Sequence, residues 1–195
     1  MEHSPDPKKT LVQTALKLFA SRGYHAVSIA DIVRESGCTR GALYYYFSSK
    51  EELGYAAIDE MMRLLMEKGA GRHLQANEHP IDRLLEMVDD LPGVVRLDTG
   101  ESLTPSTYIR LAALHEGFRE RLVAAQVPLV QKCEEMVRKG ITDGQIADSV
   151  DPRALTRMFV VMSQGIQLTS LLGQPEDIYE EARIWLKEYL NSLRK

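Results

Sequence analysis

The sequence predicts an all-α protein, and three observations lead to that prediction. Apolar residues recur at intervals of three and four positions through most of the chain. Serine, threonine or proline stands where such segments begin, and glycine stands where several of them end. Runs that alternate β-branched and polar residues are absent from the sequence. With 195 residues, of which 44% are hydrophobic, the chain can bury a sizeable core.

The first two expected helices have recognisable ends. Apolar side chains within residues 11–19 fall on one face of a helix, which ends near Gly23 because glycine is the usual helix terminator. Ser28 precedes a second helix of about two turns and is a favourable N-cap, while Asp31 suits the positive end of the helix dipole. This second helix is expected to end at Gly37.

The third and fourth helices are expected to follow at once. Thr39 can cap a short third helix, in which Leu43 and Phe47 are four residues apart and therefore share one face. Ser49 and Glu52 then form the Ser-x-x-Glu pattern of a capping box, which marks the start of a longer helix.

The remainder of the chain is also expected to be helical, with residues 92–104 as a loop. Proline opens several segments, since it favours the first helical position, and Pro128 is expected to kink or break one long segment. The expected segments cover residues 80–91, 105–117, 119–139, 152–173 and 175–193, which brings the total to about nine helices.

Composition limits the class of protein. The 24 basic and 28 acidic residues give a net charge of −4, which argues against coating nucleic acid or an anionic membrane by bulk positive charge. Two cysteines, Cys38 and Cys133, are too few for a disulfide framework and fit a reducing compartment. The sequence contains neither an apolar run of the roughly 18–20 residues that span a membrane nor a signal peptide. We therefore expect a soluble cytoplasmic protein that does not bind membranes.

Charge is unevenly distributed along the chain. Residues 1–50 contain seven basic and four acidic groups, a net charge of +3, whereas residues 51–195 contain 17 basic and 24 acidic groups, a net charge of −7. A change of sign suggests two parts with different partners, with chance as the alternative. We expect a first domain over residues 1–50 and a second domain over residues 51–195.

The second and third helices have the dimensions of a helix-turn-helix, because both are short and a glycine-containing turn joins them. In that motif the second helix enters the major groove of DNA, and its first residues meet the base edges. Leu43 and Phe47 define the buried side of this helix, which leaves Gly41 and Tyr45 nearly opposite them. Gly41 lets the helix approach DNA closely, and Arg40 in the first turn is free to point toward the DNA.

Phosphate groups can be held around the same motif. Ser28 and Thr39 lie at helix N-termini, where free N–H groups and the helix dipole attract anions. Lys50, at the start of the fourth helix, adds a positive charge at the same end.

Several short motifs follow one another at fixed spacing over residues 10–56. They are A-x-x-L-F at residues 15–19, R-G-Y at 22–24, S-x-x-D-I at 28–32, Gly37, G-x-L-Y-x-Y-F at 41–47, and S-K-E-x-L at 49–53. In this order they resemble the N-terminal domain of the TetR family of bacterial transcriptional regulators. Cys38 stands where that family usually has a small aliphatic residue, and Arg40 stands where lysine is common. Beyond residue 56 the resemblance is only one of helix pattern.

The resemblance implies a homodimer that binds a palindromic operator in double-stranded DNA and leaves it when a small-molecule effector binds the second domain. The predicted function is therefore a ligand-responsive transcriptional regulator, most often a repressor. The residues that would meet bases or nearby backbone are Arg40, Gly41, Tyr44 and Tyr45. Those that would hold phosphates are Ser28, Thr39, Tyr46 and Lys50. Simple packing is the alternative for the tyrosines, above all for Tyr46.

Two further sets of residues are candidates in the second domain. An apolar wall with a few polar groups suits a small ligand, with ordinary core packing as the alternative for each residue. The expected lining residues are Met87, Tyr108, Leu111, His115 and Phe118. The last two helices carry more apolar surface than one subunit is expected to cover, which favours pairing with a second copy. The expected dimer residues are Met158, Phe159, Met162, Ile166, Trp185 and Tyr189.

Catalytic, cofactor and metal motifs are absent from the sequence. It has neither a G-x-S-x-G motif nor a glycine-rich phosphate loop, and its five histidines show no paired helical spacing. We therefore expect no enzymatic activity, no cofactor and no metal site. Two rival functions stay open: a small-molecule-binding or enzymatic helical protein that keeps the fold without reading DNA, and an activator or nucleoid protein. Cys38 is either a buried turn residue or a redox switch.

Overall fold

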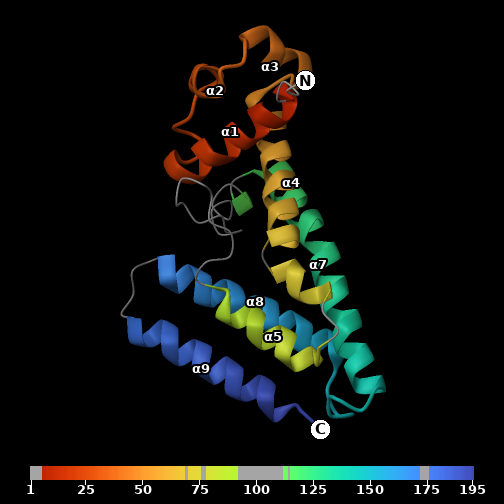
Figure 1. Ribbon diagram of the computed structural model, residues 1–195. Helices are drawn as coiled ribbons and strands as arrows, with labels where there is room; N and C mark the ends of the chain where they lie inside the picture. The colour runs from red at the N-terminus through yellow and green to blue at the C-terminus, as the bar shows by residue number, and fades with distance from the viewer. Residues whose placement is uncertain (1–5, 69, 76–77, 92–111, 114, 172–175) are drawn as a thin grey trace, which may run out of the picture. The chain divides into compact units, whose positions relative to one another are not determined.

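The computed structural model describes residues 6–68, 70–75, 78–91, 112–113, 115–171 and 176–195 (Figure 1). Within them the backbone forms eight named α-helices and one 3-10 helix, and the β-type pairing is limited to an isolated bridge between Ile146 and Arg194. The predicted all-α class is confirmed. None of the described helices is both long and apolar enough to cross a membrane. The helices are α1 (Pro7–Arg22), α2 (Ile29–Ser36), α3 (Arg40–Tyr46), α4 (Lys50–Lys68), η1 (Ala70–Gln75), α5 (Pro80–Asp89), α7 (Glu116–Thr142), α8 (Pro152–Leu171) and α9 (Glu176–Ser192).

Backbone contacts divide the chain into two compact units. The first unit comprises Met1–Arg63 and Arg96–Ala125, and the second comprises Leu64–Val95 and Gln126–Lys195. Helices α4 and α7 each contribute residues to both units. The units describe packing alone, and the functional boundary expected after residue 50 stays a prediction.

Helices α1, α2 and α3 pack against one another in the first unit. Helix α1 begins where the Asp6 carboxylate accepts a hydrogen bond from the Lys8 N–H, and it ends at Gly23, whose φ of 80° suits glycine. The side chains that the sequence assigned to the buried face of α1 are buried, as are the main apolar residues of α2 and α3. These buried residues are Leu11, Ala15, Leu18, Phe19, Ile32 and Leu43.

An aromatic cluster, formed by Phe19, Tyr24, Tyr55 and Phe118, joins four segments of the first unit. The ring of Tyr24 lies 5.0 Å from that of Phe19 and 5.0 Å from that of Phe118, while the rings of Phe118 and Tyr55 are 4.9 Å apart. Edge-on and tilted pairs at such distances add about 0.5–1.5 kcal/mol each beyond the burial of apolar area. Phe118 is fully buried, so the cluster is part of the core that holds α4 and α7 together in this unit.

Glycine allows the close approach of α4 and α7 beside this cluster. A Cβ atom at Gly54 would lie 2.7 Å from Cζ of Phe118 and 3.1 Å from Cε2 of Tyr24. A Cβ atom at Gly117 would lie 2.0 Å from the hydroxyl oxygen of Tyr55. A side chain at either position would therefore force a neighbouring aromatic ring to shift.

The second unit packs α5, α8, α9 and the later part of α7 around one core, and α9 contacts both α5 and α8 (Figure 1). Helix α5 begins at Pro80, as predicted, and His79 caps it by accepting a hydrogen bond from the Ile81 N–H. Helix α8 begins at Pro152, also as predicted, where the Asp151 carboxylate accepts hydrogen bonds from two backbone N–H groups. Fully buried members of this core are Ile81, Leu84, Val88, Val137, Ile146, Leu186 and Leu190.

Helix α7 differs from its predicted form. It continues through Pro128 as one helix and ends at Thr142. Of the predicted kink or break at the proline, the break is therefore ruled out, and the predicted end at Gly140 was wrong. Gly140 serves close packing instead: a Cβ atom there would lie 2.8 Å from Cγ of Pro80 and 2.9 Å from Cδ1 of Ile146. The expected loop over residues 92–104 and most of the expected helix over 105–117 lie outside the described residues.

We expect the Gly54→Ala variant to be less stable than the wild type by about 1–3 kcal/mol, because the added methyl group overpacks a buried aromatic core. The matched control is Gly41→Ala on α3, where a Cβ atom would meet only the Thr39 hydroxyl oxygen, at 3.8 Å. This control should leave stability unchanged or raise it by up to about 1 kcal/mol. Urea unfolding followed by circular dichroism measures both, and equal stabilities of the two variants would contradict the packing described at Gly54.

Candidate nucleic-acid interface

Helix α2 begins with a complete capping box. The Asp31 N–H donates to the Ser28 hydroxyl oxygen at 3.1 Å, and the Asp31 carboxylate accepts from the Ser28 N–H at 3.0 Å and from its hydroxyl at 2.6 Å. Arg34 donates to the same carboxylate. The helix ends at Gly37, which has a left-handed φ of 67° and turns the chain toward α3. The predicted boundaries of this helix are confirmed.

Helix α3 is oriented by two buried side chains, Leu43 and Phe47, and by the N-cap residue Thr39. The Ala42 N–H donates to the Thr39 hydroxyl oxygen at 3.0 Å, which fixes where the helix begins. Leu43 and Phe47 are buried, as the sequence predicted. Because these two side chains face the core, the opposite face of α3 is presented to solvent.

The exposed face of α3 carries aromatic and basic groups. Tyr45 is 82% exposed, and its ring packs edge-on against that of Tyr46 at 4.9 Å. The Arg40 guanidinium lies 5.7 Å from the centre of the Tyr44 ring. Gly41 lies between these groups, so the helix surface there is bare backbone. Large exposed aromatic residues beside an arginine indicate a contact surface, since burial would otherwise stabilise them.

Lys50 begins α4 and is half-buried. Its ammonium nitrogen lies 4.3 Å above the centre of the Tyr24 ring. Burial lowers the pKa of Lys50, and burial together with the nearby Glu51 carboxylate raises the pKa of Tyr24. The sequence identified Lys50 but not its aromatic partner, because Tyr24 lies in a turn between two helices, where periodicity carries no signal.

The start of α4 differs in detail from the predicted capping box. The Glu52 N–H donates to the Ser49 hydroxyl oxygen at 3.1 Å, as predicted. The return bond to the Glu52 carboxylate comes from the Ser48 N–H, at 2.8 Å, and not from Ser49. The cap still satisfies two backbone donors and lowers the pKa of Glu52.

All eight residues expected to contact DNA lie in the first unit, on α2, α3, α4 or their caps. The hydroxyls of Ser28 and Thr39 are both engaged in helix caps. Arg40 and Lys50 have no carboxylate partner within the described residues. The arrangement therefore presents two uncompensated cations together with exposed tyrosines, which is chemistry suited to phosphates and base edges.

The residues expected to bind a small ligand are distributed over both units. Met87 is buried in the core of the second unit. Phe118 is buried in the aromatic cluster of the first unit, and the exposed His115 lies beside it with a ring distance of 6.1 Å. Tyr108 and Leu111 lie outside the described residues. The effector site stays a prediction.

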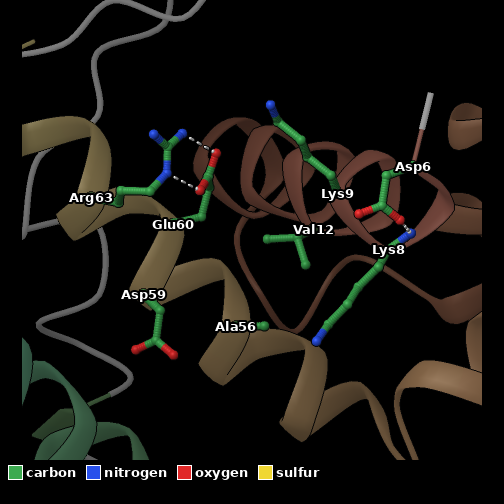
Figure 2. Close-up of a pocket in the computed structure, with 8 residues that line it drawn as sticks. All are labelled: Asp6, Lys8, Lys9, Val12, Ala56, Asp59, Glu60 and Arg63. Carbon is green, nitrogen blue, oxygen red and sulfur yellow. Dashed lines mark hydrogen bonds and ion pairs between the residues drawn. The ribbon is translucent and has the colours of Figure 1, made fainter. Parts of the chain in front are cut away.

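A hollow of about 290 Å³ lies between the start of α1 and the face of α4, within the first unit. Figure 2 shows the residues that line it. Its lining includes Val12 together with the carboxylates of Asp59 and Glu60. Asp59 accepts two hydrogen bonds from Arg121, and Glu60 accepts two from Arg63. The arginines therefore already engage both carboxylates, and two lysines at the start of α1 also line this hollow.

The residues expected at a dimer interface fall into two groups. Phe159 and Ile166 are buried in the core of the second unit and do not form an exposed face. Met158, Trp185 and Tyr189 are exposed, Met162 is half-buried, and the rings of Trp185 and Tyr189 stack at 5.6 Å with an angle of 4° between their planes. Further exposed apolar residues on the same two helices are Val161, Leu168, Ile178 and Ile184.

Metal-binding groups of three or more histidine, cysteine or carboxylate residues do not occur in the part of the chain that the structure describes. Cys38 is half-buried in the turn between α2 and α3, and Cys133 is buried on α7, where burial raises its pKa to about 12. A thiol with so high a pKa is unreactive near neutral pH.

Comparisons with known proteins agree with this geometry. The family model described as "Bacterial regulatory proteins, tetR family" matches residues 11–57. The chain is similar to the uncharacterized HTH-type transcriptional regulator YfiR of Bacillus subtilis (strain 168), with 26% identity over 205 residues that cover 100% of this chain and 97% of that protein.

Solved structures share the fold of the whole chain. A TetR transcriptional regulator from Chloroflexus aurantiacus J-10-FL has a TM-score of 0.80 at 24% identity, over 96% of each chain. The reduced form of E. coli NemR has a TM-score of 0.79 at 18% identity, over 97% of each chain. Both matches extend well beyond the helix-turn-helix, so the second unit also has the architecture of these regulators.

We expect the capping box of α2 to make stability depend on acid pH. The hydrogen bonds from Ser28, followed by that from Arg34, hold the pKa of the Asp31 carboxyl well below its usual value. A depressed pKa means that the carboxylate contributes stability at neutral pH, and that this contribution is lost as the pH falls below about 4. Asp31→Asn should therefore be less stable than wild type at pH 6, with a smaller difference at pH 3.

Urea unfolding at both pH values measures this effect. Glu35→Gln is the matched control, because Glu35 is an exposed carboxylate of the same helix without a hydrogen bond in the described residues. A difference between Asp31→Asn and wild type that is the same at both pH values would show that the cap does not depend on the carboxylate charge.

Proposed function

We propose that this chain, which belongs to the TetR family of helix-turn-helix transcriptional regulators, is a repressor that binds a palindromic operator as a homodimer and releases it when a small molecule binds. The TetR family consists of regulators and not of enzymes, so we propose no catalytic reaction for this chain. We propose four features of this regulator: a palindromic operator, a homodimer, a small-molecule effector and repression as the direction of control.

One observation carries the DNA-binding part of the proposal: buried Leu43 and Phe47 orient α3 so that Gly41 and Tyr45 are exposed on its other side, with Arg40 exposed in its first turn. A recognition helix has to expose its first residues to the base edges of the major groove. Arginine suits guanine, since its two donors match the O6 and N7 acceptors of that base. Tyrosine supplies a ring for base or sugar contacts and a hydroxyl for phosphate.

The phosphate contacts in this proposal come from groups around the reading helix. The N-terminus of α2 at Ser28 and that of α3 at Thr39 each offer backbone N–H donors and a favourable dipole. Tyr46 would add a hydroxyl donor, and Lys50 would add a full positive charge. Together these contacts would hold the reading helix in register on the duplex.

Exposed apolar side chains of α8 and α9 support the homodimer. Trp185 is 54% exposed and Met158 equally so, and a flat stack of Trp185 on Tyr189 presents a large apolar surface. Dimerisation would set the two reading helices about 34–36 Å apart, one turn of DNA or a multiple of it. A two-fold axis in the protein would then match a palindrome in the operator.

Effector control in this proposal is a shift between two states. We assign DNA reading to residues 1–50 and effector binding and dimerisation to residues 51–195. A small molecule that binds more tightly to a dimer with a different spacing of its reading helices lowers operator affinity by that difference in binding free energy.

Selection from a pool of random DNA duplexes tests the proposal directly. The full-length chain should enrich a palindromic sequence with two half-sites. A pool that stays random after several rounds would contradict specific DNA binding and favour the alternative of a small-molecule-binding protein that keeps the fold. Enrichment without a palindrome would contradict the dimeric arrangement.

Arg40→Ala and Tyr45→Ala should weaken binding to the selected duplex, with Arg40 costing about 1–3 kcal/mol if it contacts a guanine. Gel shift at constant salt measures the affinities. Arg153→Ala is the matched control, because Arg153 is an exposed arginine in the first turn of α8 in the second unit. An unchanged affinity in Arg40→Ala would remove this arginine from base reading.

Trp185→Glu should convert the homodimer into monomers at micromolar concentration, because it places a charge in an apolar interface. Analytical ultracentrifugation gives the mass directly. Val123→Glu is the control, since Val123 is an exposed valine on α7 outside this surface and its substitution should leave the dimer intact. A wild-type chain that sediments as a monomer would overturn the dimer.

A further inference from the structure

The ammonium group of Lys50 has an unusual environment. It is half-buried, yet within the described residues it makes neither a hydrogen bond nor an ion pair. The structure places this ammonium over the face of the Tyr24 ring, 4.3 Å from its centre. A cation over an aromatic face is held by the negative quadrupole of the ring, and its N–H donors stay available on the other side. The ring therefore holds the charge without neutralising it.

Tyr24 itself is fixed from two sides. Its ring packs on Phe19 of α1 and, edge-on, on Phe118 in the first turn of α7, with both ring distances at 5.0 Å. Phe118 is fully buried and also contacts the Tyr55 ring of α4. Gly54 permits this contact, because any side chain there would collide with Phe118. The Phe118 ring thus has little room to move without moving Tyr24.

We infer that Tyr24 is a positioning residue that holds the Lys50 ammonium toward a DNA phosphate, and that Phe118 holds Tyr24 in place. The inference rests on the proposed function, in which Lys50 contacts phosphate. It adds a path through three side chains, Phe118, Tyr24 and Lys50, by which the start of α7 controls a charge at the DNA surface. A shift of Phe118 would loosen Tyr24 and leave Lys50 free to move, so phosphate affinity would fall without any change in the reading helix.

The contact between Tyr24 and Lys50 can be measured without DNA. In the full-length chain with 13C-labelled lysine, the Hε signal of Lys50, assigned with Lys50→Arg, should lie upfield of ordinary lysine signals because of the Tyr24 ring current. The shift should persist in Tyr24→Phe, vanish in Tyr24→Leu and shrink in Phe118→Leu. An ordinary Lys50 signal in the wild type, or a shift that survives in Tyr24→Leu, would overturn the inference.

The consequence for DNA is measured by the salt dependence of binding to the selected duplex. Lys50→Ala should lower the slope of log affinity against log salt by about one unit. Tyr24→Leu should weaken binding about three- to tenfold and lower the slope in the same way, whereas Tyr24→Phe should match the wild type. Phe118→Leu should weaken binding by less than Tyr24→Leu. Lys132→Ala, an exposed lysine of the second unit, should have no effect.

A double variant separates positioning from general destabilisation. If Tyr24 acts through Lys50, the double variant Tyr24→Leu/Lys50→Ala should bind no more weakly than Lys50→Ala alone. Losses that multiply in the double variant would overturn the positioning role. Thermal unfolding of each variant shows that the chains compared are folded. If selection enriches no duplex, the proposed function fails, and the lysine signal still decides whether Tyr24 holds Lys50.

Discussion

Burial of Leu43 and Phe47 is the constraint on which the DNA-facing surface depends. Helix α3 has seven residues, far fewer than the 12–15 or so that an isolated helix needs for stability in water, so its orientation comes from packing and capping. Once these two side chains enter the core, the helical period directs Gly41 and Tyr45 outward. The cap at Thr39 fixes the first turn, and with it the position of Arg40.

Local signals in the sequence predicted local structure well. Ser28 with Asp31, and Thr39 before α3, are interactions between residues three positions apart, so their spacing alone specifies them. Contacts between distant residues left no such signal. Glycine is the residue type that usually ends a helix, yet Gly140 lies inside α7, where its lack of a side chain allows close packing against Pro80 and Ile146. The same reason explains why the partner of Lys50 was not predicted.

The residues predicted for a dimer interface and for an effector site show a second limit of helical periodicity. Helical spacing identifies apolar positions on α8, but it does not say which of two apolar faces its own subunit covers. The structure buries Phe159 and Ile166 and exposes Met158 and Val161, which lie on different sides of the same helix. Likewise, Met87 and Phe118 both have the character of pocket residues, and they belong to the cores of different units. The sequence was enough to identify apolar residues suited to an interface or a pocket, whereas the neighbours of each side chain depend on tertiary packing.

The distribution of ion pairs reconciles an acidic chain with DNA binding. The net charge of −4 argues only against a protein that coats DNA, because phosphate contacts depend on the charges that remain uncompensated at the surface. In the second unit several cations face carboxylates: Arg183 and Lys187 share Asp89, and Arg194 pairs with Asp82.

At the reading helix the cations face aromatic rings instead. Arg40 lies beside Tyr44 and Lys50 lies over Tyr24, and neither has a carboxylate partner within the described residues. A ring holds a cation in place while leaving its charge and its donors available to an anion, whereas a carboxylate would cancel both. Aromatic residues of the first unit therefore build its core and also lie beside Arg40 and Lys50, the two cations that the proposed function assigns to DNA.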